Sequence, residues 1–183
     1  MLSMTIVHYP IYDRKGLIQS SSITPFDIHD LSRTATTYGL DRLYLIHPSP
    51  LQRSVAERIL GFWEYGGGKD WNPCRSLALQ IAEVLPSFKF AVDAMVERFG
   101  KKPFLVATTA KILPGQISFI DLRNKLDKEH IMLVLGTGWG LTEEVLETCN
   151  AILEPIKGPT NFNHLSVRAA GAIMCDRLLG ECR

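Results

Sequence analysis

Short apolar runs alternate with longer amphipathic segments along the chain. The apolar runs carry few polar interruptions, as expected of strands that are buried on both faces of a parallel sheet. On this basis five segments are predicted to be strands: Thr5–Tyr9, Leu43–Ile46, Pro103–Thr108, Ile131–Leu135 and Ala151–Leu153.

The amphipathic segments predict helices, and the first of them has the clearest start signal. Thr24 at the N-cap, Pro25 at the first helical position and Asp27 three residues after the cap form a capping pattern. This helix presents one apolar face and ends at Gly39. Further helices are predicted over residues 51–64, over 75–99 with an interruption at Pro86, over 118–126, after Thr142 and over 163–179.

Strict alternation of strands and helices indicates an α/β fold, in which a parallel sheet carries helices on both faces. No internal repeat, linker or low-complexity run divides the sequence. Residues 1–183 are therefore predicted to form a single domain.

Composition supports a folded domain and excludes several classes of protein. Hydrophobic residues make up 46% of the chain and charged residues 21%, which excludes a disordered chain, a collagen and a coiled coil. The longest apolar run, Ile131–Leu135, is too short to cross a membrane. The N-terminus has no basic region before its apolar stretch and no small-residue cleavage site, so no signal peptide is expected.

Charge and cysteine content bear on the partner, the metal sites and the redox state that are expected. Twenty basic residues against nineteen acidic ones give a net charge of +1, so an RNA partner requires a local concentration of basic residues. The four cysteines are widely spaced and form no CxxC pair, and no metal site is expected. Reduced thiols in a cytoplasmic protein are predicted.

A glycine-rich turn, Gly136–Gly140, follows a predicted buried strand and precedes a predicted helix. Ligands bind at the carboxyl ends of strands in such folds. The third glycine comes one residue too early for a dinucleotide fingerprint, and Glu143 and Glu144 would repel a pyrophosphate at the following helix. The turn suits a cationic ligand that needs close backbone approach, such as S-adenosylmethionine. The alternative is an ordinary tight turn that requires positive φ angles.

Three segments together resemble the motifs of SPOUT-class RNA methyltransferases, in the same order and spacing. The segments are Asp27–Leu40, with Arg33-Thr34-Ala35 inside it, Leu133–Leu141, and Leu153–Gly158 followed by His164–Ala170. The chain also resembles a compact bacterial subgroup of SAM-dependent RNA methyltransferases, which shares the Asn72-Pro73-x-Arg75 loop. The resemblance covers nearly the whole chain.

The resemblance implies a SPOUT-like fold with a C-terminal deep trefoil knot and a homodimer. It also implies S-adenosylmethionine as cofactor and methyl transfer to transfer or ribosomal RNA, at a base or at a ribose 2′-hydroxyl. Two departures from the family pattern stand out. A glutamate common in the second motif is replaced by Gly138, and Asp27 and His29 replace the usual Asn and Gly. The alternative function is therefore a non-catalytic module that binds S-adenosylmethionine or RNA.

The resemblance places catalytic residues on the first predicted helix. Arg33 corresponds to an arginine that acts on the RNA backbone or the ribose, since a guanidinium holds a phosphate bidentately. Asp27 is a candidate general base. The alternatives are a solvated Arg33 that pairs with Asp30 or Thr37, and an Asp27 that only caps the helix.

The resemblance also implies a cofactor pocket built from loop residues and backbone amides rather than from charges. The residues expected to bind S-adenosylmethionine are Thr108, Thr109, Gly136, Thr137, Gly138, Ile156, His164, Leu165 and Ser166. For Thr108 and Thr109 the alternative is an ordinary β-branched strand end. For Ser166 the alternative is a role as the cap of the last predicted helix.

Aromatic residues alternate with cations around Gly66–Gly68, which is typical of a surface that stacks unpaired bases. These residues are Phe62, Trp63, Tyr65, Lys69, Trp71 and Arg75. Lys69 and Arg75, together with Arg33, are the predicted RNA-binding residues. The alternative is a set of core aromatics beside an exposed loop.

The last predicted helix is apolar around nearly all of its circumference, so its own sheet cannot cover it completely. A second copy of the chain is expected to supply the missing cover, which predicts a homodimer through this helix.

Overall fold

A six-stranded, all-parallel sheet forms the centre of the computed structural model, which describes residues 1–181. Across the sheet the strands lie in the order β5 (Ala82–Leu85), β4 (Leu43–Ile46), β1 (Leu2–Val7), β7 (Ile131–Gly136), β6 (Phe104–Ala107) and β8 (Ala151–Ile152). Every neighbouring pair runs parallel, which confirms the predicted parallel arrangement. The first strand covers Leu2–Val7 rather than the predicted Thr5–Tyr9.

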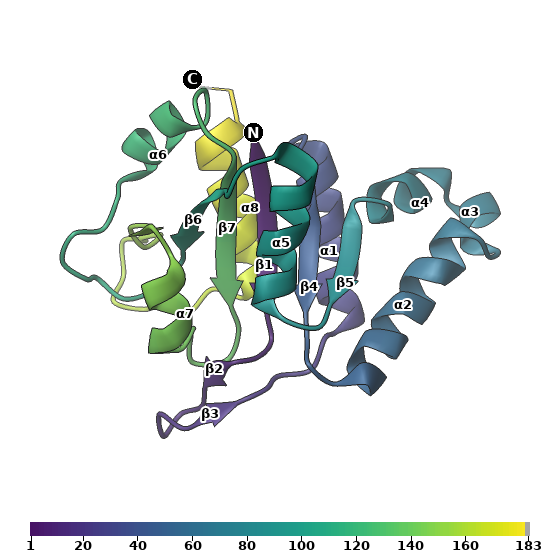
Figure 1. Ribbon diagram of the computed structural model, residues 1–183, viewed down its shortest axis with the longest axis horizontal. Helices are drawn as coiled ribbons and strands as arrows, with labels where there is room; N and C mark the ends of the chain where they lie inside the picture. Colours follow the sequence, from purple (N-terminus) through teal and green to yellow (C-terminus); the bar gives the residue numbers. More distant parts are fainter. Residues whose placement is uncertain (182–183) are drawn as a thin grey trace.

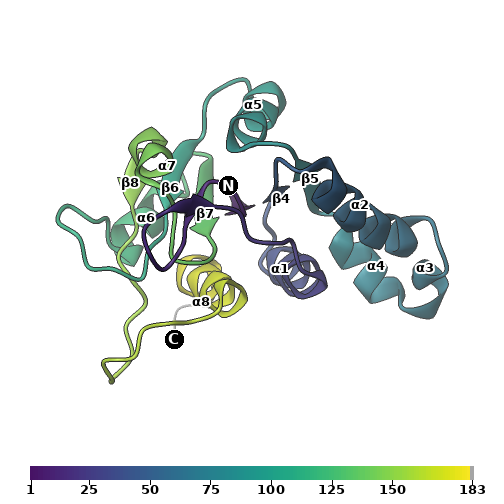
Figure 2. The same ribbon diagram turned by 90° about the horizontal axis from the view of Figure 1, so that it is seen from below.

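Helices cover both faces of this sheet, as predicted (Figure 1, Figure 2). Helices α5 (Phe88–Phe99) and α7 (Glu143–Thr148) pack on one face. The other face carries α1 (Pro25–Thr37), α2 (Pro50–Glu64), α4 (Pro73–Leu79), α6 (Phe119–Lys125) and α8 (Val167–Leu179), with the single-turn α3 (Gly68–Trp71) between α2 and α4.

The core lies on the two faces of the central strands β1 and β7. Met4 and Leu133 pack on the α1 and α8 side, whereas Val7 and Val134 pack on the α5 and α7 side. Side chains alternate between the faces of a strand, so strands that are apolar throughout contribute to both layers. Such a doubly covered sheet holds the ends of its strands in fixed positions.

The start of α1 forms as the sequence predicts. Thr24 accepts a hydrogen bond from the Asp27 amide, and the Asp27 carboxylate accepts one from the Thr24 amide, so both halves of a capping box are present. Ile28, Leu31 and Ala35 are buried against the sheet. Helix α1 is therefore fixed at its N-terminus and along one side.

Two helix predictions are wrong. The segment 75–99 is not one interrupted helix, because α4 ends at Leu79 and β5 follows before α5 begins. Strand β5 pairs with β4 at the sheet edge, and this long-range pairing outweighs the helical periodicity of the window. The last helix begins at Val167 rather than near Asn163, because the Ser166 side chain caps it.

A short antiparallel hairpin, β2 (Ile11–Tyr12) and β3 (Ile18–Gln19), was not predicted. Its turn is held by the Asp13 carboxylate, which accepts hydrogen bonds from the amides of Lys15 and Leu17. The hairpin lies beyond the carboxyl ends of β1 and β7 (Figure 1).

The thiols of Cys74, Cys149 and Cys175 are free, and Cys182 lies outside the described residues. Burial raises the pKa of Cys149 to about 11 and that of Cys175 to about 12. Among residues 1–181 no helix is long and apolar enough to cross a membrane.

Candidate active site

The carboxyl ends of strands β1, β4, β6 and β7 lie next to one another along one border of the sheet, which we call its carboxyl edge, because parallel strands share their direction. The glycine-rich turn continues β7, and Thr108 continues β6. The Thr108 amide and hydroxyl both donate to the carbonyl oxygen of Val134, at 3.0 and 3.1 Å. The loops after β6 and β7 are therefore fixed side by side, as the predicted cofactor pocket requires.

The glycine-rich turn needs glycine at two positions for different reasons. A Cβ atom on Gly136 would lie 2.8 Å from the Leu141 side chain. Gly138 has a φ of +58°, and a Cβ there would lie 2.8 Å from Cδ1 of Ile11 and 3.1 Å from the Tyr12 carbonyl oxygen. The turn is thus packed closely against the β2–β3 hairpin, and the Trp139 amide donates to the Tyr12 carbonyl at 3.0 Å.

A chain of polar side chains, running from the buried His8 to the half-buried Ser21, anchors Thr137. The Thr137 hydroxyl contacts the Ser21 hydroxyl at 2.5 Å and the Val7 carbonyl oxygen at 3.3 Å, and Ser21 contacts Nδ1 of His8 at 2.9 Å. His8 is 1% exposed, and its Nε2 has no partner among the described residues. Burial lowers the His8 pKa to about 4, which keeps the ring neutral at pH 7.

His47 continues β4 and lies beside His8, with ring centroids 6.3 Å apart. It is buried as well, and burial lowers its pKa. The centre of this sheet edge therefore holds two neutral imidazoles. Neither was singled out from the sequence, where His8 lies inside the first predicted strand and His47 directly follows the second.

The segment after β8 lies against the loop after β6. The Gln116 side chain donates to the Leu153 carbonyl at 3.1 Å, and the Glu154 amide donates to the Ile117 carbonyl at 2.9 Å. Further along, the Asn163 side chain donates to the Ala110 carbonyl at 2.9 Å. The C-terminal segment thus contacts both limbs of the loop 108–118.

The predicted cofactor residues of this segment differ in exposure. Ile156 is half-buried and packs against the core, whereas His164 and Leu165 are exposed. Ser166 caps α8 by accepting from the Ala169 amide at 3.2 Å. Thr109 uses its hydroxyl in the same local way, accepting from the Lys111 amide at 3.1 Å. Both oxygens keep further hydrogen-bonding capacity.

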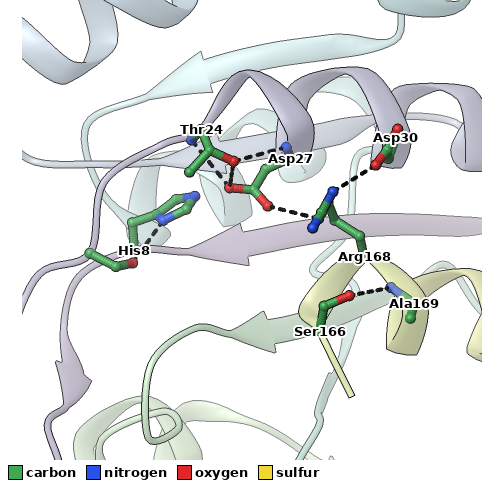
Figure 3. A network of polar contacts seen from close by, with 8 residues as sticks. His8, Thr24, Asp27, Asp30, Ser166, Arg168 and Ala169 are labelled. Atoms are coloured by element: carbon green, nitrogen blue, oxygen red, sulfur yellow. Dashed lines mark hydrogen bonds and ion pairs between the residues drawn. The ribbon is translucent and has the colours of Figure 1, made fainter. Parts of the chain in front are cut away.

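An ion-pair network joins the start of α1 to the start of α8 (Figure 3). Arg168 of α8 donates to the Asp30 carboxylate at 2.9 Å and lies 3.8 Å from an Asp27 oxygen. The other Asp27 oxygen accepts from the Thr24 hydroxyl at 2.6 Å. Asp27 is 6% exposed, so its carboxylate is buried among these partners. Arg168 was not predicted to belong to the site.

Arg33 is exposed on α1, two turns from the N-terminus. Asp30, its expected surface partner, pairs with Arg168 instead. The Arg33 side chain lines two open hollows. One, of about 310 Å³, lies between it, Asp30 and Tyr38, and the other, of about 280 Å³, lies between it and Arg75.

The structure brings Arg33 and Arg75 together but leaves Lys69 outside their shared hollow, on α3. The aromatic cluster also divides. Trp63 is buried, as the core interpretation expects, whereas Tyr65 and Trp71 are 83% and 79% exposed.

Among residues 1–181 no group of three or more histidine, cysteine or carboxylate side chains is placed to hold a metal ion.

The chemistry of the sheet edge fits a neutral or cationic nucleoside. Its donors are hydroxyls and backbone groups, and the turn is followed by Glu143 and Glu144 in the first turn of α7. A parallel α/β sheet with such loops at its carboxyl edge is typical of enzymes that bind a nucleoside cofactor. The chain belongs to a family of SAM-dependent RNA methyltransferases, because the family model matches residues 1–180.

The relatives found by sequence share about a third or more of the residues. The chain is 40% identical over 181 residues to a tRNA (guanine-N(1)-)-methyltransferase of Nitratidesulfovibrio vulgaris and 36% identical over 180 residues to one of Oleidesulfovibrio alaskensis. It covers 42% of the length of each. An uncharacterized protein of Aquifex aeolicus is 34% identical over 182 residues, which are 98% of this chain and 89% of that one.

Solved structures share the fold at lower identity. The SpoU methyltransferase AviRb from Streptomyces viridochromogenes, determined in complex with AdoMet, superposes with a TM-score of 0.58 at 15% identity. The match covers 98% of this chain and 56% of that one. The fold is therefore the mostly parallel α/β fold of SpoU-like methyltransferases.

Proposed function

We propose that the chain transfers a methyl group from S-adenosylmethionine to tRNA, and that residues 1–183 act as one catalytic domain. The family and the names of two relatives support this reaction. The observation that carries the proposal is the convergence of three loops at one sheet edge. Thr108 bonds to the end of β7, and Asn163 bonds to the loop that follows Thr108.

We propose that the cofactor is held in the region of these loops by Thr108, Thr109, Gly136, Thr137 and Gly138, and by Ile156, His164, Leu165 and Ser166. S-adenosylmethionine supplies an electrophilic methyl group on a sulfonium when bound. The protein contributes close backbone approach at the glycines and a Thr137 that the His8–Ser21 chain holds in place. This is mainly a positioning contribution to the rate.

Arg33 is proposed to contact the RNA, because it is exposed, lines two hollows and has no carboxylate within 4.0 Å among the described residues. A guanidinium in this situation binds a phosphate or stabilises a developing negative charge. Asp27 is the second proposed catalytic residue. Its existing bonds to Thr24 and Arg168 support a role in positioning α1 and α8 against each other.

We propose further that the C-terminal segment forms the deep trefoil knot of the SPOUT fold, with residues 153–166 passing through the loop 108–118. Contacts of this segment with Ala110 on one limb and Ile117 on the other support the threading. We also propose a homodimer through α8 and a cytoplasmic site of action, where tRNA is modified.

Tritium transfer from labelled S-adenosylmethionine into bulk tRNA tests the proposed reaction. The wild-type chain is expected to label the RNA, and Arg33→Ala is expected to label it at least about a hundredfold more slowly, as for loss of a charge-stabilising group. Arg58→Ala, which removes an exposed arginine of α2, is the matched control and is expected to keep wild-type activity. Cofactor binding without any transfer would show the non-catalytic alternative to be correct.

Mass spectrometry of the labelled tRNA identifies the modified nucleotide. The relatives' name specifies guanine N1, but it describes whole proteins of which this chain spans 42%. The same experiment therefore also distinguishes methylation of a base from methylation of a ribose. Transfer to a guanine N1 is the outcome that the relatives' name supports.

A further inference from the structure

A group of large apolar side chains stands exposed on the helices beyond the β5 edge of the sheet. The exposed fractions are 49% for Phe62, 83% for Tyr65, 79% for Trp71 and 63% for Leu77. Phe62, Trp71 and Leu77 lie on α2, α3 and α4, and Tyr65 follows directly after α2. Figure 2 shows these three helices as a group beside α1 at one end of the molecule. Clustered exposed aromatics of this kind mark binding surfaces.

The Trp71 ring is exposed and yet held in orientation. It stacks nearly parallel on the buried Trp63 ring, with centroids 6.2 Å apart and 12° between the planes. Trp63 is itself packed edge-on by Phe62 at 5.3 Å and by His29 at 5.6 Å. One side of Trp71 is thereby supported by rigid side chains, while most of the ring stays open to solvent.

The approach of α3 to Trp63 depends on a glycine. A Cβ atom on Gly68 would lie 2.7 Å from the Trp63 ring and 2.9 Å from the Phe62 ring. Only a residue without a side chain lets α3 pack so closely, and α3 carries Trp71 at its end. Gly68 therefore allows α3 to place Trp71 against its support.

A cationic hollow lies next to this aromatic group. Arg33 and Arg75 line it together with Thr36, Thr37, Asn72, Cys74 and Ala78, and no carboxylate is among the lining residues. Neither guanidinium has a carboxylate within 4.0 Å in the described part of the chain. Arg75 also lies over the Trp63 ring at 5.0 Å, which links the hollow to the stack.

The field of the two arginines is felt by a neighbouring side chain. Burial lowers the pKa of His29, and the charges of Arg75 and Arg33 lower it further. Asp30, which acts in the opposite sense, is engaged by Arg168 on the α8 side. The hollow therefore presents uncompensated positive charge to an anion.

We propose that Trp71 and the Arg33–Arg75 hollow together bind one unstacked nucleotide of the RNA substrate, with the base on the Trp71 ring and a phosphate in the hollow. The inference rests on the proposed function, because it assigns a part of the same RNA. A flat aromatic surface beside two free guanidiniums matches an exposed base joined to a phosphate. A paired base is inaccessible to such a surface, so the bound nucleotide lies in a loop or a single strand.

Arg33 lines both hollows, so the nucleotide on Trp71 lies beside the part of the RNA that Arg33 is proposed to contact. The platform accordingly contributes to RNA affinity and to the choice of site in the RNA. It does not touch the loops proposed to hold the cofactor.

Binding of an unmodified tRNA transcript and of a short oligouridylate, measured by filter retention, tests the proposal. Trp71→Ala is expected to raise the Kd for both by at least about fivefold, the effect of losing one stacked base, and Trp71→Phe is expected to restore most of the affinity. Phe90→Ala, on an exposed aromatic of α5, is the matched control and is expected to change nothing. Arg75→Gln is expected to reduce the salt dependence of log K by about 0.7.

The proposal is overturned if Trp71→Ala binds RNA like the wild type, or if Phe90→Ala weakens binding as much. Calorimetric titration of the same variants with S-adenosylmethionine separates this result from failure of the proposed function. Trp71→Ala is expected to bind the cofactor normally. A wild-type chain that methylates tRNA while Trp71→Ala binds RNA unchanged would leave the reaction standing and refute the platform alone.

Discussion

His8 combines nearly complete burial with an unpartnered Nε2, at the point where β1 meets the glycine-rich turn. Its pKa of about 4 lies below the 6.5 of an unfolded histidine. The unfolded chain therefore binds a proton that the folded chain excludes as the pH falls below 6.5. Asp27 faces this ring and opposes the shift, whereas His47 adds to it.

The wild-type chain is accordingly expected to lose stability on acidification, by about 2 kcal/mol from His8 alone between pH 7 and pH 5. Urea unfolding at the two pH values measures the loss. His8→Gln is expected to remove this part of the pH dependence, while His164→Gln, at an exposed histidine, keeps it. Equal pH dependence in wild type and His8→Gln would contradict the assignment.

Gly138 has a left-handed backbone conformation and also a close neighbour, Ile11. A comparison with Gly16 separates the cost of backbone strain from the cost of the steric clash. Gly138→Ala adds left-handed strain of about 1–2 kcal/mol and a Cβ atom 2.8 Å from Ile11. Gly16→Ala, with a φ of +79° and open space around it, adds strain alone. Thermal unfolding is expected to show a larger loss for Gly138→Ala, and calorimetry is expected to show weaker cofactor binding for that variant only.

At the scale of elements, the network of Asp27, Asp30 and Arg168 ties α1 to α8. The Arg168 side chain is 34% exposed, so its ion pairs contribute at most about 1 kcal/mol. The capping box of Asp27 contributes a similar amount in a more buried setting. The ion pairs and the cap therefore contribute comparable amounts to the placement of the two helices.

Asp27→Ala is expected to lower the free energy of unfolding by about 1–2 kcal/mol, since it removes the cap and one partner of Arg168. Asp121→Ala, which breaks the equivalent but exposed contact with Ser118 at the start of α6, is the control and is expected to cost less. Asp27→Asn separates positioning from catalysis. An unchanged pH profile of the rate supports positioning, and loss of the profile's acidic limb shows that Asp27 is the general base.

Sequence patterns predicted the elements whose signals are local. The Thr24–Asp27 cap and the long apolar strand at Ile131 involve neighbours along the chain, and both are confirmed. Strand β5 was missed because three of its residues are only half-buried, Glu83 is exposed, and its partner strand lies about forty residues away. His8 and Arg168 were missed because their importance comes from packing between distant segments.

At the scale of the whole molecule, several apolar side chains of α8 are only partly covered within the described chain. Val167, Ala169, Ala170, Ala172 and Ile173 are only half-buried, which supports a second copy as its cover. Ile173→Glu is therefore expected to convert a homodimer into a monomer. Sedimentation equilibrium is expected to give twice the 20.5 kDa of one chain for the wild type.

Ile120→Glu, on the exposed surface of α6, is the control for the dimer and is expected to leave the mass unchanged. A wild-type chain that sediments as a monomer at all concentrations would refute the interface.

The central claim is that the loops after β6 and β7 and the segment before α8 enclose one cofactor. Chemical-shift mapping of the backbone amides during titration with S-adenosylmethionine tests it most directly. The largest shifts are predicted for residues 108–110, 136–138 and 156–166, with none in α2–α4. Binding that shifts amides elsewhere, or an absence of binding at millimolar cofactor, would contradict it.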